Sequence, residues 1–302
     1  MFSDTKNHGE SESCQIMTFE MNNPVRCMSP AKVNLYLKVL SRRPDGYHDL
    51  ATLMQRISLY DEMFFRLTSA AGIVLHCPGS SLPEDKANIV HRAAESFFHR
   101  VGFSGGVEII LKKSIPLAAG LGGGSSNAAT TLLTLNEFAG RPCSRTDLME
   151  IGVALGSDIP FFILEATAWA FGIGDRLEAV AHPPQFHFLL VNPGFELSTR
   201  KVYEGLNLTL TKEPIHYSIP RFFECHDVIK GLHNDLETVS INLYPVLDEI
   251  KTLLLGHGAA GALMSGSGPT IFGVFDNEDM AMKAEESLQG YGTWSLFRAH
   301  TI

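Results

Sequence analysis

The chain has 302 residues, of which 45% are hydrophobic, and its formal net charge at pH 7 is -9. This length accommodates one large or two ordinary domains, each with a substantial core. The acidic balance argues against nucleic-acid and membrane partners, because both need a basic surface to hold them. The most apolar long stretch, residues 159–174, is interrupted by Glu165 and is too short to cross a bilayer.

Three further features of the composition bear on the class of protein. Residues 1–23 are polar and aperiodic, so we expect a disordered N-terminal extension, and they lack the apolar core of a signal peptide. The five cysteines are far apart and show no CxxC spacing, so neither a disulfide framework nor a zinc site is indicated, and a reducing cytoplasm fits. The twelve histidines show no HxxxH or HExxH spacing, so we predict no metal held by the protein alone.

Alternating and short apolar runs dominate the first hundred residues. The alternation of apolar Val33, Leu35, Leu37 and Val39 with polar neighbours predicts a strand over residues 25–40. Residues 42–48, RRPDGYH, form a turn by their Pro-Asp-Gly content. Further strands are predicted at residues 52–59, 63–67, 73–76 and 107–111, with a helix at 88–101.

The stretch from Pro116 to Ala129 reads PLAAGLGGGSSNAA and precedes a helical pattern that runs to Ala139. Glycines allow positive φ and close approach of the backbone to a ligand, and the Ser-Ser-Asn run offers good helix N-cap residues. A glycine loop that leads into a helix N-terminus presents free N–H groups to a phosphate. No lysine follows the glycines as in a P-loop, and the acidic ribose ligand of a Rossmann fold is missing. The stretch therefore predicts a nucleotide or phosphate site of another kind.

The second half of the chain alternates helices and strands. A helix is predicted from Ser144 to Leu155 with a Ser-Asp capping pair, followed by a turn at residues 157–160 that leads into apolar strands. The strand at 186–191 ends in Asn-Pro-Gly, close to an expected domain boundary. Beyond it we predict helices at residues 245–255 and from Asp276 to 288, strands at 259–264, 270–275 and 295–299, and the loop SGSGP at 265–269.

The chain contains three motifs that together resemble those of the GHMP kinases, the family of galactokinase, homoserine kinase and mevalonate kinase. They are PAKVNLYL at residues 30–37, the glycine stretch, and GALMSGSGPT at 261–270. The resemblance covers Val25 to the C-terminus. It implies an α+β, two-domain fold, with an N-terminal ATP-binding unit like ribosomal protein S5 domain 2 at 24–190 and a C-terminal ferredoxin-like α/β sandwich at 191–302.

Within this family, RRPDGYH, GLGGGSSNAAT, LGSDIPFF and HNDLE are similar to the branch of the non-mevalonate isoprenoid pathway. This implies transfer of the γ-phosphoryl group of ATP to the 2-hydroxyl of a methylerythritol linked to cytidine diphosphate. Magnesium would arrive with the ATP. The expected partners are these small molecules only, and the expected assembly is a monomer or homodimer.

The resemblance also implies roles for single residues. Asp158 is similar to the catalytic base of the family and Lys32 to its cationic partner, a pair that suits phosphoryl transfer. From the residues alone, Lys32 could equally be a solvated strand lysine and Asp158 a turn or cap carboxylate.

The binding residues follow in the same way. Asn34 would orient the acceptor, and Tyr47, His48 and Tyr203 would recognise the cytidine. The implied ATP-binding residues are Pro116, Gly120, Leu121, Gly122, Gly123, Gly124, Ser125 and Ser126, with Asn88 and Lys113 on the adenine side. The SGSGP loop would add Ser265, Gly266, Ser267 and Gly268 to the acceptor site, and Ser125 or Ser126 could contact the magnesium ion.

Three alternatives stand beside this interpretation. Another GHMP kinase, acting on homoserine or mevalonate, would lack the DGYH element. A non-catalytic nucleotide-binding protein on the same fold would not need both Lys32 and Asp158. A Rossmann oxidoreductase would need the acidic ribose ligand and a doubly wound alternation of strands and helices.

Overall fold

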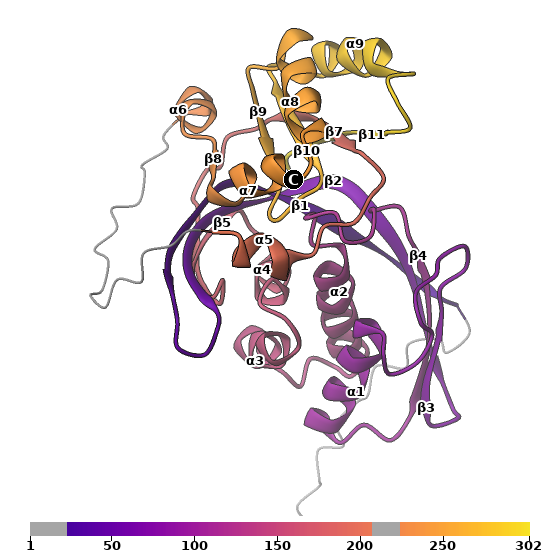
Figure 1. The fold of residues 1–302 in the computed structure, drawn as a ribbon. Coiled ribbons are helices and arrows are strands. Elements are labelled where there is room, and N and C mark those ends of the chain that lie inside the picture. The colour runs from indigo at the N-terminus through magenta and orange to yellow at the C-terminus, as the bar shows by residue number, and fades with distance from the viewer. Residues whose placement is uncertain (1–22, 207–223) are drawn as a thin grey trace, which may run out of the picture.

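The protein, seen here in a computed structural model that describes residues 23–206 and 224–302, contains two sheets with helices packed on each (Figure 1). Residues 1–22 of the expected disordered extension lie outside the described residues. The first sheet has the strand order β3-β4-β2-β1-β8, with β5 paired to β2 and β6 to β5. Its strands are β1 (Val25–Arg42), β2 (His48–Thr68), β3 (Gly72–His76), β4 (Gly106–Lys112), β5 (Ala168–Gly172), β6 (Arg176–Ala179) and β8 (His233–Asn234).

The two strands expected at residues 52–59 and 63–67 are one long strand, β2. Its antiparallel pairing with β1 shifts register where Pro30 and Ala31 face Tyr60 and Ile57, so two residues bulge out of the ladder. Asp61, between the two expected strands, pairs in regular register with Ser29. It is completely buried, and its carboxylate accepts main-chain N–H groups from Ser114 and Ile115.

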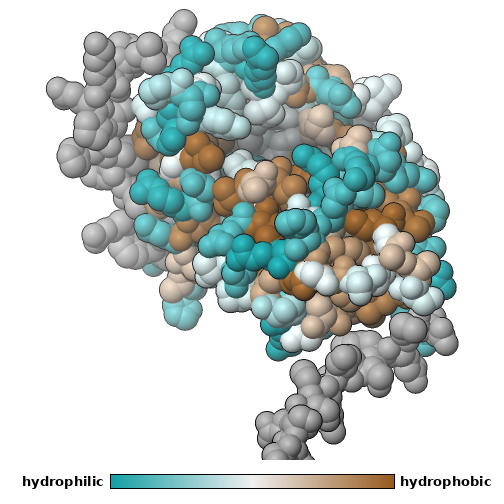
Figure 2. Space-filling model, turned by 90° about the horizontal axis from the view of Figure 1, so that it is seen from below, coloured by the Kyte–Doolittle hydropathy of each residue, from teal (hydrophilic) through white to brown (hydrophobic). Residues whose placement is uncertain are grey.

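Four helices lie beneath the arch of β1 and β2 (Figure 1). They are α1 (Ile89–Val101), α2 (Gly123–Phe138), α3 (Arg145–Leu155) and α4 (Ile159–Leu164). The capping pair of Ser144 and Asp147 forms as expected. Seen from below, hydrophilic and hydrophobic side chains are interspersed over the surface (Figure 2), while the inner faces of the helices, such as Ala93 and Phe97 of α1, join the core against β2 and β4.

Two helix starts differ from expectation. Helix α2 begins at Gly123, with Gly122 at the N-cap at a φ of +69°, so Ser125, Ser126 and Asn127 lie in its first turns instead of capping it. Glycine takes this left-handed conformation without strain, so Gly122 can serve as the N-cap. The helix therefore begins at Gly123, before the first residue of its hydrophobic pattern. The apolar run expected to enter strands after Pro160 forms α4, since a proline in the first turn favours a helix start.

The second sheet is antiparallel in the order β11-β7-β10-β9. It is built from β7 (His187–Asn192), β9 (Gly261–Met264), β10 (Ile271–Phe275) and β11 (Ser295–His300), with α8 (Val246–Gly256) and α9 (Glu278–Leu288) packed on it. This order, with α9 joining β10 to β11, is that of a ferredoxin-like sandwich and confirms the α+β fold class. The cap of α9 is Asn277, whose side chain accepts a hydrogen bond from Met280, and not Asp276.

The two sheets share one hydrophobic cluster. Val33 of β1 and Ile57 of β2 belong to it together with Phe188 of β7 and Phe272 of β10. The division expected between residues 190 and 191 falls inside β7, which pairs wholly within the second sheet. A division of the chain at this place would therefore have to precede β7. Three helices were not expected, α5 (Thr199–Glu204), α6 (Cys225–Lys230) and α7 (Asp235–Leu243).

Candidate active site

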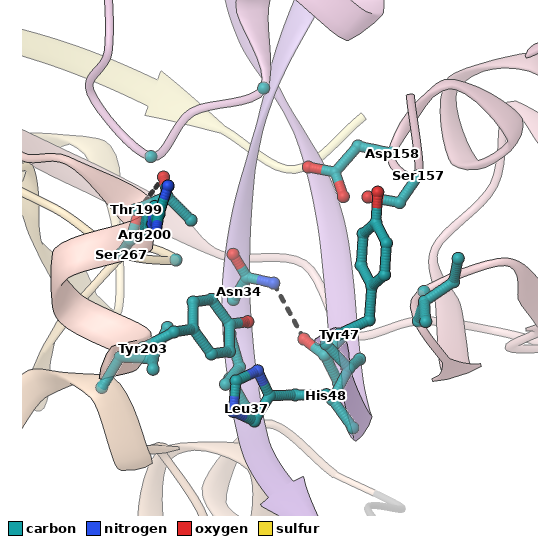
Figure 3. A pocket seen from close by; sticks show the side chains of 18 of the residues that line it. Asn34, Leu37, Tyr47, His48, Ser157, Asp158, Thr199, Arg200, Tyr203 and Ser267 are labelled. Atoms are coloured by element: carbon teal, nitrogen blue, oxygen red, sulfur yellow. Dashed lines mark hydrogen bonds between the residues drawn. The ribbon is translucent and has the colours of Figure 1, made fainter. Parts of the chain in front are cut away.

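A cavity of about 1000 Å³ lies where β1, the glycine loop, the turn before α4, helix α5 and the SGSGP loop meet. Figure 3 shows side chains from these separate segments converging on it. Eleven of the residues singled out from the sequence line this cavity: Lys32, Asn34, Tyr47, His48, Gly120, Gly122, Ser125, Asp158, Tyr203, Gly266 and Ser267.

Nine other predicted residues do not line it: Pro116, Leu121, Gly123, Gly124, Ser126, Asn88, Lys113, Ser265 and Gly268. Asn88 uses its amide within the fold, capping α1 and donating to the Pro83 carbonyl at 2.8 Å. Lys113 forms a buried ion pair with Asp61, close to Gly123. The adenine contacts proposed for these two side chains stay a prediction.

Lys32 is held almost completely out of water, with 4% of its surface exposed. Its Nζ donates to Asn34 Oδ1 at 2.5 Å, and the amide of Asn34 in turn donates to Thr52 Oγ1 at 2.8 Å. Burial lowers the pKa of Lys32, because it penalises the ammonium form, and the nearby carboxylate of Asp158 acts in the opposite direction. This burial is unlike that of a solvated strand lysine.

Asp158 stands at the N-cap position of α4 but its side chain makes no capping hydrogen bond. One carboxylate oxygen lies 3.8 Å from Lys32 Nζ, which is an ion-pair distance but too long for a hydrogen bond. The side chain is 35% exposed and faces the cavity (Figure 3). Its oxygens therefore remain available to a ligand hydroxyl.

The glycine loop packs against both the catalytic strand and the SGSGP loop. The N–H of Lys32 donates to the Leu121 carbonyl at 3.0 Å. At Gly122, with φ +69°, a Cβ would lie 3.0 Å from Lys32 Cγ and from the Phe162 ring. At Gly120, with φ +74°, a Cβ would lie 2.1 Å from the Ser265 carbonyl oxygen. The loop therefore leaves no room for a side chain at either position.

Three aromatic side chains, Tyr47, His48 and Tyr203, line the same cavity as the ion pair and form its aromatic rim. His48 stacks on Tyr203 with ring centroids 4.9 Å apart, and Tyr47 is 61% exposed beside them (Figure 3). Burial and the nearby Arg42 lower the pKa of His48, so its ring is neutral at neutral pH and offers both a donor and an acceptor. Burial raises the pKa of Tyr203, so its hydroxyl stays protonated.

Seven further polar residues line the cavity that sequence reasoning did not find: Arg42, Asp45, Thr52, Ser157, Thr199, Arg200 and Glu204. Thr199 Oγ1 lies 2.8 Å from Ser267 Oγ, so α5 touches the SGSGP loop at this point (Figure 3). The signal available in the sequence was the polar STRK run beside Tyr203.

The oxygen donors at the site suit a magnesium ion that a nucleotide brings. In residues 23–206 and 224–302, no group of three or more His, Cys, Asp or Glu side chains is placed to hold a metal. The hydroxyl of Ser125 and the carboxylate of Asp158 both line the cavity, and oxygen ligands are what Mg²⁺ prefers. Ser126 is excluded as a ligand because it is buried and hydrogen-bonded to Ser29 at 2.8 Å.

Comparison with known proteins decides the family. The model of the GHMP kinases N terminal domain matches residues 88–166, and that of GHMP kinases C terminal matches residues 225–293. A 4-diphosphocytidyl-2-C-methyl-D-erythritol kinase of Syntrophus aciditrophicus (strain SB) is 58% identical over 278 residues, covering 92% of this chain and 99% of that protein. The chain belongs to this family of GHMP kinases.

Further relatives of this GHMP kinase agree. A protein of the same name from Syntrophotalea carbinolica is 49% identical, covering 91% of this chain and 98% of that protein. A crystal structure of 4-(cytidine 5'-diphospho)-2C-methyl-D-erythritol kinase matches with a TM-score of 0.75 and 35% identity over 91% of this chain and 99% of that one. Mevalonate kinase of Methanococcus jannaschii, with a TM-score of 0.69 and 14% identity over 93% of this chain and 99% of that one, shares the fold.

Membership makes the chain a small-molecule kinase with ATP as its phosphoryl donor. Among the described parts of the chain, no helix has the length and apolar character needed to cross a membrane.

Proposed function

We propose that this kinase transfers the γ-phosphoryl group of ATP to the 2-hydroxyl of 4-diphosphocytidyl-2-C-methyl-D-erythritol. One observation carries the proposal. A single cavity is lined by the Lys32–Asp158 pair, by the glycine loop and by the stacked rings of His48 and Tyr203. A donor phosphate and a nucleobase-bearing acceptor therefore have separate, suited surfaces within reach of one another.

The glycine loop and the first turn of α2 bind the triphosphate through main-chain N–H groups and the positive end of the helix dipole. Magnesium, when bound with ATP, neutralises charge that develops on the transferring phosphoryl group. The Ser125 hydroxyl, which lines the cavity, is the side chain of this chain that would contact it.

Asp158 acts as the general base in this scheme. The oxygen of the 2-hydroxyl forms the new bond to the γ-phosphorus, while the bond from that phosphorus to the β–γ bridging oxygen breaks and ADP leaves with the electron pair. The hydroxyl proton passes to the Asp158 carboxylate, which makes no capping bond and is free to accept it. Lys32, in its ammonium form, offsets negative charge on the phosphoryl group.

The rim recognises the cytidine. The faces of Tyr47 and Tyr203 provide stacking area, and the neutral ring of His48 offers hydrogen bonds to the base edge. Asn34, positioned by Lys32 and Thr52, orients the acceptor alcohol near the carboxylate. This arrangement uses the nucleotide part of the acceptor as a handle for the reacting part.

We place the reaction in the cytoplasm, with the protein acting as a monomer or homodimer. The four described cysteines, Cys27, Cys77, Cys143 and Cys225, all carry free thiols, as in a reducing compartment.

The proposal is tested by ADP release in a coupled assay, with the cytidylated methylerythritol, homoserine and mevalonate offered in parallel. We expect release with the cytidylated alcohol only. Homoserine or mevalonate supporting release while the cytidylated alcohol does not would assign the protein to another GHMP kinase activity. Binding of ATP without release in any of the three would favour a non-catalytic nucleotide-binding protein.

A further inference from the structure

The HNDLE segment, residues 233–237, lies outside the machinery described so far. Its first two residues form β8, which pairs in parallel with β1 at Tyr36 and Leu37. Since β1 also carries Lys32 and Asn34, the segment is attached to the strand that bears the catalytic lysine. Immediately after β8 the chain enters α7, with Asn234 at its N-cap.

Asn234 uses every polar atom of its side chain within the fold. Its Nδ2 donates to the carbonyl oxygen of Met264 at 2.8 Å and to that of Gly266 at 2.7 Å, and its Oδ1 accepts from the N–H of Leu236 at 3.0 Å. The residue is 6% exposed. Only a carboxamide supplies two donors and one acceptor in this geometry, and buried polar groups left unpaired are costly.

Both acceptor carbonyls belong to the SGSGP loop or to the strand that leads into it. The same helix holds that strand a second time, because Glu237 accepts from the N–H of Met264 at 2.9 Å while its other oxygen pairs with Lys251 at 2.6 Å. The beginning of the loop is thus fixed from one side by the N-cap residue of α7, Asn234, and by Glu237 in its first turn.

On its other side the loop touches the catalytic machinery. Ser265 Oγ donates to the Gly120 carbonyl at 2.9 Å, which is a contact with the glycine loop. Gly266 has a φ of +56°, and a Cβ built on it would lie 3.3 Å from Asn34 Oδ1 and 3.4 Å from Lys32 Nζ. The loop therefore forms the wall against which the ammonium group and the glycine loop rest.

We infer that Asn234 is a positioning residue, which sets the SGSGP loop against Lys32 and the glycine loop and so fixes the distance between them. It does not line the cavity and acts only through that loop. The inference deepens the proposed function, on which its turnover readout rests.

The test compares Asn234→Asp with Asn192→Asp. Both change a buried carboxamide to a carboxyl of the same size. Asn192 is 5% exposed, donates to Thr270 Oγ1 at 3.0 Å and accepts from the N–H of Gly194 at 2.9 Å, so these hydrogen bonds do not reach residues 265–268. We expect Asn234→Asp to lower turnover of the folded enzyme about tenfold or more, with KM for the acceptor nearly unchanged. Asn192→Asp should keep turnover within about threefold, although its melting temperature falls similarly.

A pH series adds a readout that general destabilisation does not move. The carboxyl introduced by Asn234→Asp faces two carbonyl oxygens, and protonation at lower pH restores one of the two lost donors. The turnover of this variant relative to wild type, corrected for the folded fraction, should therefore rise as pH falls, while the same ratio for Asn192→Asp stays flat. Normal turnover in Asn234→Asp, or a flat ratio, would overturn the inference.

If Asn234→Asp yields no folded protein, Ser265→Ala removes only the hydroxyl that bonds to Gly120 and tests the same wall. Unaltered turnover and ATP affinity in that variant would contradict the inference. If wild type itself does not phosphorylate the cytidylated acceptor, the proposed function is wrong, but the role of Asn234 can still be tested. Calorimetry with a non-hydrolysable ATP analogue then compares the affinities of the two variants. Asn234→Asp should then weaken binding of the analogue about tenfold and Asn192→Asp should not, and equal affinities would overturn the inference.

Discussion

Lys32 lies in a place where little water can stabilise its charged form. Its hydrogen bond to Asn34 and the carboxylate of Asp158 at 3.8 Å partly compensate for the loss of solvent. Such a cation is poised to respond strongly to a polyphosphate, because charges interact more strongly where water is excluded. The burial that lowers its pKa is therefore part of its function.

The titration of Lys32 can be followed by carbon NMR on protein labelled at lysine. Because burial lowers its pKa, Lys32 should lose its proton at a lower pH than the exposed lysines. Asp158 raises this pKa, so Asp158→Asn should move the titration of Lys32 to still lower pH. A Lys32 signal that titrates with the exposed lysines, or one that is unaffected by Asp158→Asn, would contradict the coupling of the two groups.

Asp158→Asn separates chemistry from binding. The amide keeps the size of the side chain but cannot accept a proton, so turnover should fall about a hundredfold to ten-thousandfold with little change in affinity for either substrate. Ser144→Ala, which removes the cap of α3, is the control, and should lower stability by about 1 kcal/mol while leaving turnover of the folded fraction intact. A near-normal single-turnover rate for Asp158→Asn would rule out its role as base.

At the residue level, motif spacing predicted the members of the cavity better than residue type did. Lys32, Asp158 and His48 come from separate segments, and all three line it. The surroundings of Asp61 were not predictable, because a buried carboxylate needs donors from a segment more than fifty residues away. Arg42 and Thr199 were missed for a similar reason, since nothing local marks which polar loop side chain faces a cavity.

The glycine loop is the element on which the proposed phosphate binding depends. Positive φ at Gly120 and Gly122 lets it pass between Lys32 and the SGSGP loop, where a Cβ would collide with neighbouring atoms. Gly122 is also the N-cap of α2. The same glycine therefore lets the loop pack closely against its neighbours and begins the helix.

Gly122→Val should weaken ATP binding at least tenfold while the protein stays folded. A Cβ there meets Lys32 Cγ and the Phe162 ring at 3.0 Å, and the left-handed conformation itself costs a non-glycine residue about 1–2 kcal/mol. Gly140→Val is a matched control, since its φ is +79° but nothing lies within 4 Å of a Cβ. Calorimetric titration with ATP and thermal melting check both variants. Equal ATP affinity for the two would remove the loop from the phosphate site.

Elements with a strong local signal were predicted well, and those set by tertiary packing were not. Helix α3 and its Ser144 cap follow from local chemistry. The start of α2 was placed too late, because hydrophobic spacing begins only after the glycines. Helix α4 was taken for a strand, because a six-residue apolar run fits either structure until packing decides.

For the whole molecule, the resemblance to the GHMP kinases implied the α+β class and a ferredoxin-like second unit, and the strand order of the second sheet confirms both. The place of division between domains did not, since β7 pairs in the second sheet and β8 returns to the first. Such pairings join residues that are distant in the chain, so a local sequence pattern does not predict them. The shared cluster around Phe188 and Phe272 holds the two sheets, and with them the walls of the cavity, together.

The central claim is that this molecule places one phosphoryl group on one particular hydroxyl. In 2-C-methyl-D-erythritol the carbon that bears the 2-hydroxyl carries a methyl group and no hydrogen. The most direct test is proton-coupled phosphorus NMR of a reaction with ATP and the cytidylated alcohol. The account predicts one ADP per acceptor and a new phosphomonoester signal that is a singlet. A signal split by protons on the neighbouring carbon, or ADP formed with inorganic phosphate alone, would contradict it.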